Sequence, residues 1–313
     1  MLAVAVVLLG CHAPRVTLRA APSPLLATYT STMVDVRTTL GRALIGVETR
    51  GVASEIRSAT CTAGSTTSCT RCDLVGPNDA PDAVPDEVID PAMLLDIKAA
   101  FDRYPSDVLE TSKIRRVALC RRLVDSTGAR VAGLADLASH RMFINLESFL
   151  GRPYDPEGPQ TTADIVHHEL FHLFEFEVMY DIAVDDVAWR AQNPAGFQYA
   201  TPEAGTPRPF GFVNSYATTN DREDRASVFE LLMARPDELC EIAKDDPIVR
   251  EKAQLVWERT AIVTGEAFLR RRAPCVTWIA PRTPRVMPEV PYIEPQLRRA
   301  SDREWLVPPT LAH

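Results

Sequence analysis

Residues 161–180 read TTADIVHHELFHLFEFEVMY, and this stretch decides how the rest of the chain is interpreted. Its apolar residues recur about every 3.6 positions, which predicts an amphipathic helix that either threonine at its start can cap. Within that helix, His168, Glu169 and His172 form an HExxH motif. Four residues make just over one helical turn, so the two imidazoles project from the same face and can meet at one zinc ion. Glu169 leans toward the open side of such a metal, where a carboxylate can take a proton from bound water.

The competing interpretation is a buried amphipathic helix that carries two histidines by coincidence. The chain holds only six histidines, and three of them fall within residues 167–172. Burying two imidazoles and a carboxylate without partners would cost free energy, so the pattern favours a metal site with one zinc ion per chain. His167 faces another side of the helix and is expected to be a core or supporting histidine. Glu175 and Glu177 are expected on a solvated face, with a supporting role open to Glu175 because it lies three residues after His172.

A catalytic zinc site with two histidines needs a third protein ligand. The metzincin pattern would place that ligand six residues after the second histidine, where this chain has Val178, so that pattern is excluded. A glutamate from a later helix is the alternative, and residues 216–227 read YATTNDREDRAS. The Asn-Asp pair in this segment can cap a helix, which would hold Glu223 rigidly in the first turn. Asp224 and Glu230 stay open as alternative ligands.

The HExxH motif and this segment together resemble a gluzincin-type family of candidate zinc-binding metallopeptidases found among bacterial lipoproteins. More distantly, they are similar to the catalytic domain of anthrax lethal factor and to the Pro-Pro endopeptidases. In those families a tyrosine precedes the third ligand by seven residues, and Tyr216 and Glu223 have that spacing. The resemblance covers residues 91–233, and it implies that Glu223 is the third zinc ligand and that Tyr216 hydrogen-bonds the developing oxyanion. The family pattern has a second glutamate four residues after the ligand, where this chain has Ser227, and Glu230 can substitute for it.

The resemblance implies an α+β zincin-like metallopeptidase domain, with a small mixed sheet, the HExxH helix across it and a mostly helical C-terminal half. Capping, proline and periodicity signals predict the remaining elements: a helix that begins at Pro91, helices over residues 221–235 and 247–270, and strands over residues 114–120 and 141–147. In zincins the strand before the HExxH helix usually forms the edge of the sheet. Residues 133–135 and strand 141–147 are therefore expected to form a ledge on which an extended peptide substrate lies.

Charge and composition argue against several classes of protein. The chain has 313 residues, a net charge of −8 and 46% hydrophobic residues, which are the proportions of an ordinary soluble globular protein. A nucleic-acid partner needs clustered lysine and arginine, and the longest basic run here is residues 270–272. No apolar run after residue 10 is long enough to span a membrane. We expect a peptide or protein substrate as the partner, and no nucleic acid.

Residues 1–11 read MLAVAVVLLGC, a short apolar run that ends at Cys11. This run is similar to the signal peptide of a bacterial lipoprotein, in which the cysteine becomes the lipidated first residue. It predicts an exported protein of the bacterial cell envelope, facing the periplasm or the cell surface, whose membrane contact is an N-terminal lipid anchor only. An ordinary secretory signal that is cleaved nearby, or a buried strand, is the alternative.

The cysteines also indicate export, because removing Cys11 leaves an even number that can pair as disulfides in an oxidising compartment. The six are Cys61, Cys69, Cys72, Cys120, Cys240 and Cys275. A zinc knuckle at residues 69–72 is the competing interpretation. It is disfavoured because no second CxxC or nearby histidine pair accompanies it.

These patterns divide the chain into four segments: a signal peptide over residues 1–10, a Ser/Thr/Cys-containing N-terminal region over 11–90, a metallopeptidase domain over 91–273 and a Pro-rich extended tail over 274–313. The expected activity is that of a zinc metalloendopeptidase in which metal-activated water hydrolyses a peptide bond. The competing hypotheses are a non-catalytic lipoprotein that keeps zinc structurally and a protease-derived binding module, and Ser227 is the residue that favours them.

Overall fold

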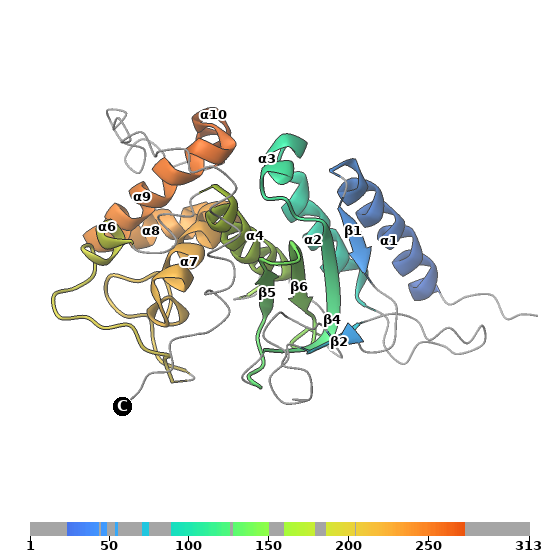
Figure 1. The fold of residues 1–313 in the computed structure, drawn as a ribbon, viewed down its shortest axis with the longest axis horizontal. Helices are drawn as coiled ribbons and strands as arrows, with labels where there is room; N and C mark the ends of the chain where they lie inside the picture. Colours follow the sequence, from blue (N-terminus) through green and yellow to red (C-terminus); the bar gives the residue numbers. More distant parts are fainter. Residues whose placement is uncertain are drawn as a thin grey trace, which may run out of the picture.

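The computed structural model describes residues 24–43, 45–48, 54–55, 71–74, 89–125, 128–149, 160–178, 186–203 and 205–272. The predicted signal peptide, the lipidation site Cys11 and the Pro-rich tail over residues 274–313 lie outside these ranges. No helix within these ranges is long and apolar enough to cross a membrane. The described chain is a mixed α+β protein, as the sequence predicted, with helices packed against a small mixed sheet (Figure 1).

Six strands form one mixed sheet within the part of the chain that the structure describes. They are β1 (Gly46–Glu48), β2 (Ser54–Glu55), β3 (Arg71–Leu74), β4 (Arg116–Val124), β5 (Gly133–Asp136) and β6 (Arg141–Asn145). Their order is β2-β3-β4-β6-β5, and β1 pairs with β4. β4 runs parallel to both β1 and β6, whereas β5 runs antiparallel to β6 and forms an edge of the sheet. Because β1, β2 and β3 precede residue 90, the sheet extends across the boundary predicted there.

The strand predicted over residues 141–147 is not at the edge of the sheet, so that expectation was wrong. β6 has β4 on one side, with Val117 opposite Met142, and β5 on the other, with Gly133 opposite Ile144. Its side chains are buried on both faces, which is the pattern of an inner strand. The chain turns back between β5 and β6, so β5 lies outside β6 and forms the edge by itself.

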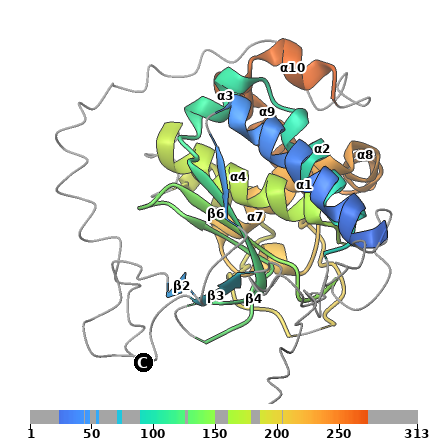
Figure 2. The same cartoon turned by 90° about the vertical axis from the view of Figure 1, so that its right-hand side faces the viewer.

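Helices α1 (Pro24–Arg42), α2 (Pro91–Asp102) and α4 (Thr162–Val178) lie side by side over one face of the sheet (Figure 2). Their apolar side chains form the main core with alternate residues of the inner strands, such as Val117 and Ile144. Successive strand residues point to opposite faces, so the residues between these belong to a smaller cluster on the far side.

The C-terminal half is mainly helical, as predicted, and α4 lies between it and the sheet (Figure 1). Its helices are α6 (Val187–Arg190), α7 (Asp221–Ala234), α8 (Pro236–Asp245), α9 (Pro247–Thr264) and α10 (Glu266–Arg270), and a short 3-10 helix, η1 (Tyr216–Thr218), precedes α7. Helix α3 (Ser106–Thr111) connects α2 to β4. α7 packs directly on α4 and therefore brings its first turn to the HExxH helix.

Two helix boundaries differ from the prediction. The helix expected over residues 247–270 is two helices, because Gly265 adopts a φ of +78° and ends α9. Glycine enters this left-handed region without the steric cost of a Cβ atom. Pro236 begins α8, a helix that the sequence patterns did not predict. Proline suits the first position of a helix, where its missing N–H has no partner to lose.

A disulfide joins Cys72 of β3 to Cys120 of β4, and Cys240 is also disulfide-bonded. The prediction that cysteines pair is confirmed for these three. The zinc knuckle at residues 69–72 is wrong, because the sulfur of Cys72 is already bonded to another sulfur. The remaining predicted disulfide cysteines lie outside the described residues: Cys61, Cys69 and Cys275.

Candidate metal centre

Two helices bring three candidate metal-ligand side chains together. α4 supplies His168 and His172, and the first turn of α7 supplies Glu223. The Oε2 atom of Glu223 lies 2.9 Å from Nε2 of His168 and 3.5 Å from Nε2 of His172. One ligand atom from each of the three residues lies within 4.8 Å of the other two. Both imidazoles therefore aim the same ring nitrogen at one carboxylate oxygen, an arrangement that suits a single metal ion.

The local sequence explains how these side chains are held. Asn220 caps α7 by accepting hydrogen bonds from the backbone N–H groups of Arg222 and Glu223, each at 3.0 Å. That cap places Glu223 in the first turn of the helix, as its capping pattern predicted. Phe171 of α4 stacks on Phe229 of α7, with ring centroids 4.8 Å apart. Aromatic packing behind the polar cluster therefore sets the distance between the two helices.

The charges in this cluster are coupled. Burial alone would lower the pKa of His168, but its hydrogen bonds to Glu223 and Glu230 outweigh burial and raise that pKa. Burial alone would raise the pKa of Glu223, but His172 and His168 outweigh burial and lower that pKa. The Glu223 carboxylate is thus held ionised, and the cluster favours a positive charge at its centre. Two imidazole nitrogens and a carboxylate oxygen are donors that suit zinc, so the residues present fit the metal that the motif implies.

The second ring nitrogen of His168 has its own partner. Nδ1 of His168 lies 3.0 Å from Oε2 of Glu230, a buried residue two turns after Glu223 on α7. A carboxylate at this nitrogen fixes the tautomer and the orientation of the ring. Ser227, where the family pattern has a glutamate, is fully buried, and its hydroxyl has no hydrogen-bond partner among the described residues. Glu230 therefore lies in a supporting position on His168.

Asp224, the other carboxylate considered as a ligand, is committed elsewhere. Its Oδ2 atom accepts a hydrogen bond from Nζ of Lys252 at 2.7 Å. The same atom accepts hydrogen bonds from the hydroxyl of Tyr199 at 2.8 Å and from the indole N–H of Trp189 at 2.9 Å. Asp224 and Lys252 are both fully buried, so this ion pair ties α7 to α9. Of the two adjacent carboxylates, Glu223 is the one that joins the histidines.

Glu169 lies beside the three ligand side chains and is only 7% exposed. Burial raises the pKa of its carboxyl group. His168, His172 and a hydrogen bond with the backbone of Ala135 lower that pKa, but by less, so the net shift is upward. A carboxylate with a raised pKa is a stronger base than a solvated one. The environment of Glu169 therefore suits proton abstraction.

Gly133, the first residue of β5, lies directly against Glu169. A Cβ atom at this position would lie 2.5 Å from Oε1 of Glu169 and 2.6 Å from Cγ2 of Ile165. Only glycine lets the strand approach the carboxylate this closely. The sequence patterns placed Gly133 in the expected ledge but did not reveal this contact, because it depends on how β5 crosses α4.

Tyr216 reaches the same point from η1. Its ring centroid lies 5.9 Å from that of His168, and its hydroxyl hydrogen-bonds Glu223. Partial burial raises the pKa of the phenol, and the negative charges of Glu223 and Glu169 raise it further. The phenol therefore keeps its proton and is a hydrogen-bond donor. About half of the side chain, 49%, is exposed, so a substrate can reach it.

Two cavities meet at Glu169 and Tyr216. The smaller, of about 280 Å³, lies toward the C-terminal end of α4 and is also lined by His172. The larger, of about 390 Å³, lies toward the N-terminal end of α4 and is also lined by Ile165. Gly133, Glu169 and Tyr216 line both cavities. Space is therefore open on both sides of the candidate catalytic residues.

The edge of β5 presents backbone groups to this space. The N–H of Asn145 donates to the carbonyl of Ala132 at 2.8 Å, so Ala132 directs its polar groups toward β6. Because this direction alternates along an antiparallel pair, Gly133 and Ala135 direct their N–H and C=O groups away from β6. The hydrogen bond between the backbone of Ala135 and Glu169 agrees with that geometry.

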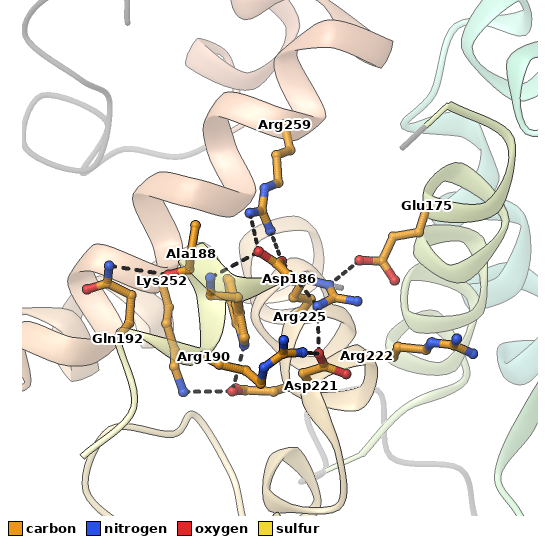
Figure 3. A network of polar contacts seen from close by, with 12 residues as sticks. Glu175, Asp186, Ala188, Arg190, Gln192, Asp221, Arg222, Arg225, Lys252 and Arg259 are labelled. Carbon is orange, nitrogen blue, oxygen red and sulfur yellow. Dashed lines mark hydrogen bonds and ion pairs between the residues drawn. The ribbon is translucent and has the colours of Figure 1, made fainter. Parts of the chain in front are cut away.

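A buried network of ion pairs supports the helices behind the site (Figure 3). Arg225 of α7, which is fully buried, pairs with Glu175 of α4 and, at 3.2 Å, with Asp186, the residue that caps α6. Arg259 of α9 donates to both oxygens of Asp186, at 2.5 and 2.8 Å. Glu175 is only 3% exposed, so its expected place on a solvated face was wrong. The network links α4, α6, α7 and α9, and no local sequence signal predicts it.

Two further residues near the motif have structural partners. His167 is fully buried, with Nδ1 2.7 Å from the hydroxyl of Tyr104, which makes it the core histidine that the sequence predicted. Burial lowers its pKa. Glu177 pairs with Lys113 and His140 and is 8% exposed, so it does not lie on a solvated face either.

No protein-family model matches the chain, and a search of curated proteins finds no match. Among solved structures, the chain is similar to a protein from Bacteroides caccae ATCC 43185 that is described as a candidate zinc-binding metallo-peptidase. The TM-score is 0.42, the sequence identity is 14%, and the match covers 81% of this chain and 94% of that chain. A likeness this distant does not establish a family, so a functional interpretation depends on the geometry of the metal centre.

Proposed function

We propose that this chain is a zinc metalloendopeptidase of the gluzincin type, which hydrolyses internal bonds of a peptide or protein substrate. One arrangement carries the proposal. Three candidate ligand side chains converge on one point: His168, His172 and Glu223. Glu169 and Tyr216 lie beside that point, and both line the two open cavities. A structural zinc site is closed by four protein ligands. The three ligands and the adjoining open space within the described residues favour catalysis instead.

The chemistry assigns a different task to each residue. Zinc held by the two histidines and Glu223 would polarise the scissile carbonyl and lower the pKa of a water molecule. Glu169 accepts the proton of the attacking water, because its buried carboxylate is a strong base, and then delivers a proton to the leaving amine. Tyr216 donates its phenolic hydrogen bond to the carbonyl oxygen as negative charge develops there. Glu230 keeps the ring of His168 oriented throughout.

An extended peptide can bind along the edge of β5. Gly133 offers outward-facing backbone groups there, whereas the backbone of Ala135 also hydrogen-bonds Glu169. Antiparallel pairing is more stable per residue than parallel pairing. β5 runs from the larger cavity, which Ala132 lines, toward the smaller one, which Leu137 lines. An antiparallel peptide therefore passes from the smaller cavity to the larger. Residues before the scissile bond occupy the smaller cavity, and residues after it occupy the larger.

Export is a further proposal, which is based on the sequence. The disulfide between Cys72 and Cys120 supports a location in an oxidising compartment. The native protein should incorporate labelled fatty acid and partition into detergent, and Cys11→Ala should lose both properties. Equal partitioning of the two forms would point to an ordinary signal peptide.

Peptide-library cleavage by the zinc-loaded protein tests the peptidase function, with Glu169→Gln as the comparison. We expect cleavage by the native protein and loss of at least ~10²-fold in the variant, because one general base contributes ~10²–10⁴-fold. Both proteins should hold about one zinc ion per chain, since Glu169 is not a ligand. His172→Ala should lose the metal, whereas His140→Ala, outside the cluster, should keep it. Native activity in Glu169→Gln, or no cleavage by the zinc-loaded native protein, would refute the proposal.

A further inference from the structure

The larger cavity ends in an unbalanced group of charges. Arg235, just after α7, lies with Nη1 2.9 Å from Oε2 of Glu238 and with Nε 3.4 Å from Oδ1 of Asp164. Its Nη2 atom lies 3.7 Å from Oε1 of Glu230. One guanidinium therefore faces three carboxylates, of which Glu230 and Glu238 line the cavity, whereas Asp164 is buried and does not line it.

Neighbouring cations do not cancel this excess. Arg130 lines the same cavity but pairs with Glu147 at 3.1 Å. Nδ1 of His168 contacts Oε2 of Glu230, yet an imidazole is neutral when it ligates a metal. Oε1 of Glu230 makes no hydrogen bond with the described residues, although Glu230 is only 8% exposed and lines the cavity. Burial, and then the charge of Glu230, raise the pKa of Asp164 to about 6, although Arg235 lowers it.

The cavity also has apolar walls. They are formed by Ile165 of α4, Leu231 of α7 and Val213, which precedes η1. Arg235 contacts Asp164, which lies five residues before Glu169 on α4, so the charged end is roughly 7 Å along the helix from the catalytic base. A side chain that enters from the catalytic centre therefore passes apolar surface before it reaches the carboxylates.

We propose that this cavity receives a lysine or arginine side chain of the substrate, from the residue that follows the scissile bond. The inference rests on the proposed peptidase function and adds a substrate class to it. The methylene groups of such a side chain pack on the apolar walls, and its cation joins the carboxylates around Arg235. An acidic side chain is disfavoured, because all three nitrogen atoms of the Arg235 guanidinium already face a carboxylate.

Binding to zinc-loaded Glu169→Gln protein separates recognition from catalysis. Cleavage mapping with the native protein first locates the scissile bond, and labelled peptides then carry lysine, norleucine or glutamate at the position after it. Lysine and norleucine have similar stems, so their difference reports the charge. We expect the lysine peptide to bind about tenfold more tightly than the norleucine peptide, and the glutamate peptide to bind most weakly. Equal affinity for lysine and norleucine, or tighter binding of glutamate, would overturn the inference.

Variants of Glu238 test the source of the preference. This side chain is 47% exposed at the rim of the cavity and belongs to none of the catalytic or metal-binding groups. Glu238→Gln should reduce the preference for lysine over norleucine by about three- to fivefold, and Glu238→Lys should abolish it. Glu241→Gln on the same helix is the matched control, because Glu241 is 77% exposed and outside the cavity, and it should leave the preference unchanged.

The two proposals fail in different ways. The inference about this cavity alone is overturned if cleavage is equally fast with and without a basic residue after the scissile bond. It is also overturned if Glu238→Lys keeps the full preference for lysine. If no peptide binds and the zinc-loaded native protein cleaves nothing, the peptidase function fails as well.

Discussion

Replacing Gly133 with alanine should disable Glu169 while leaving the metal ligands in place. The new Cβ atom would lie 2.5 Å from Oε1 of Glu169, 2.8 Å from its Cγ and 2.6 Å from Cγ2 of Ile165. Ordinary contact begins at 3.4 Å, so the carboxylate has to shift by about 0.9 Å, or β5 has to move away from α4 by a similar distance. A catalytic group misplaced by about 1 Å costs roughly 10²-fold in rate. Overpacking of this kind also destabilises a protein by about 1–3 kcal/mol.

The assay measures kcat and KM on a cleaved peptide, the zinc content and the free energy of unfolding. In Gly133→Ala, kcat should fall about 10²-fold while zinc stays near one ion per chain, because Gly133 contacts the base and none of the three ligands. Gly46→Ala is the control, since Gly46 belongs to the same sheet and its nearest neighbours would lie 3.7 Å from a new Cβ atom. A native kcat in Gly133→Ala would refute the argument that β5 presses on the catalytic carboxylate.

Three further outcomes are expected. Tyr216→Phe should lower kcat by about 10²–10³-fold with little change in KM or zinc content, because the hydrogen bond that the phenol would donate to the substrate carbonyl serves charge that exists only in the transition state; an unchanged kcat would make it a packing residue. Glu230→Gln should weaken zinc affinity by about 10- to 100-fold in a competition titration with a chelator, and unchanged affinity would show that His168 is oriented without it. Asp164 has a folded-state pKa of about 6 against an ordinary value of 3.8, so its ionised carboxylate costs the fold about 3 kcal/mol well above pH 6, and this cost falls with the pH and disappears below 3.8. In urea unfolding at pH 7.5 and pH 4.5, the native protein should therefore gain about 2 kcal/mol relative to Asp164→Asn at the lower pH, and a constant difference would contradict this assignment.

Several parts of the fold follow from residues that are close together in the sequence. The HExxH helix spans the predicted stretch as α4, and the helix after the Asn-Asp pair begins where its cap predicts, with Asn220 bonded to two backbone N–H groups. The helix that begins at Pro91 is capped by Asp90, which accepts from the N–H of Ala92. Periodicity and capping are decided within one or two turns of chain, so these elements can be predicted without knowledge of their neighbours.

The choice among candidate carboxylates needed the tertiary structure. Glu223, Asp224 and Glu230 all lie on one helix, and their positions in the sequence do not say which face of that helix meets α4. The stacking of Phe171 on Phe229 orients α7, which turns Glu223 to both histidines and Glu230 to the far side of His168. Asp224 instead pairs with Lys252 of α9.

The edge of the sheet was decided in the same way. Strand patterns in residues 133–147 show which side chains are buried, but the pairing of β6 with both β4 and β5 makes β6 an inner strand and leaves β5 at the edge. The contact of Gly133 with Glu169 and the ion pair of Arg235 with Asp164 join segments that are far apart in the chain. Local sequence therefore determined the helices, their caps and the spacing of the motif, because short-range backbone and side-chain interactions control them. Long-range packing alone decided which polar groups meet, because a periodic pattern tells that a face is buried but not what lies against it.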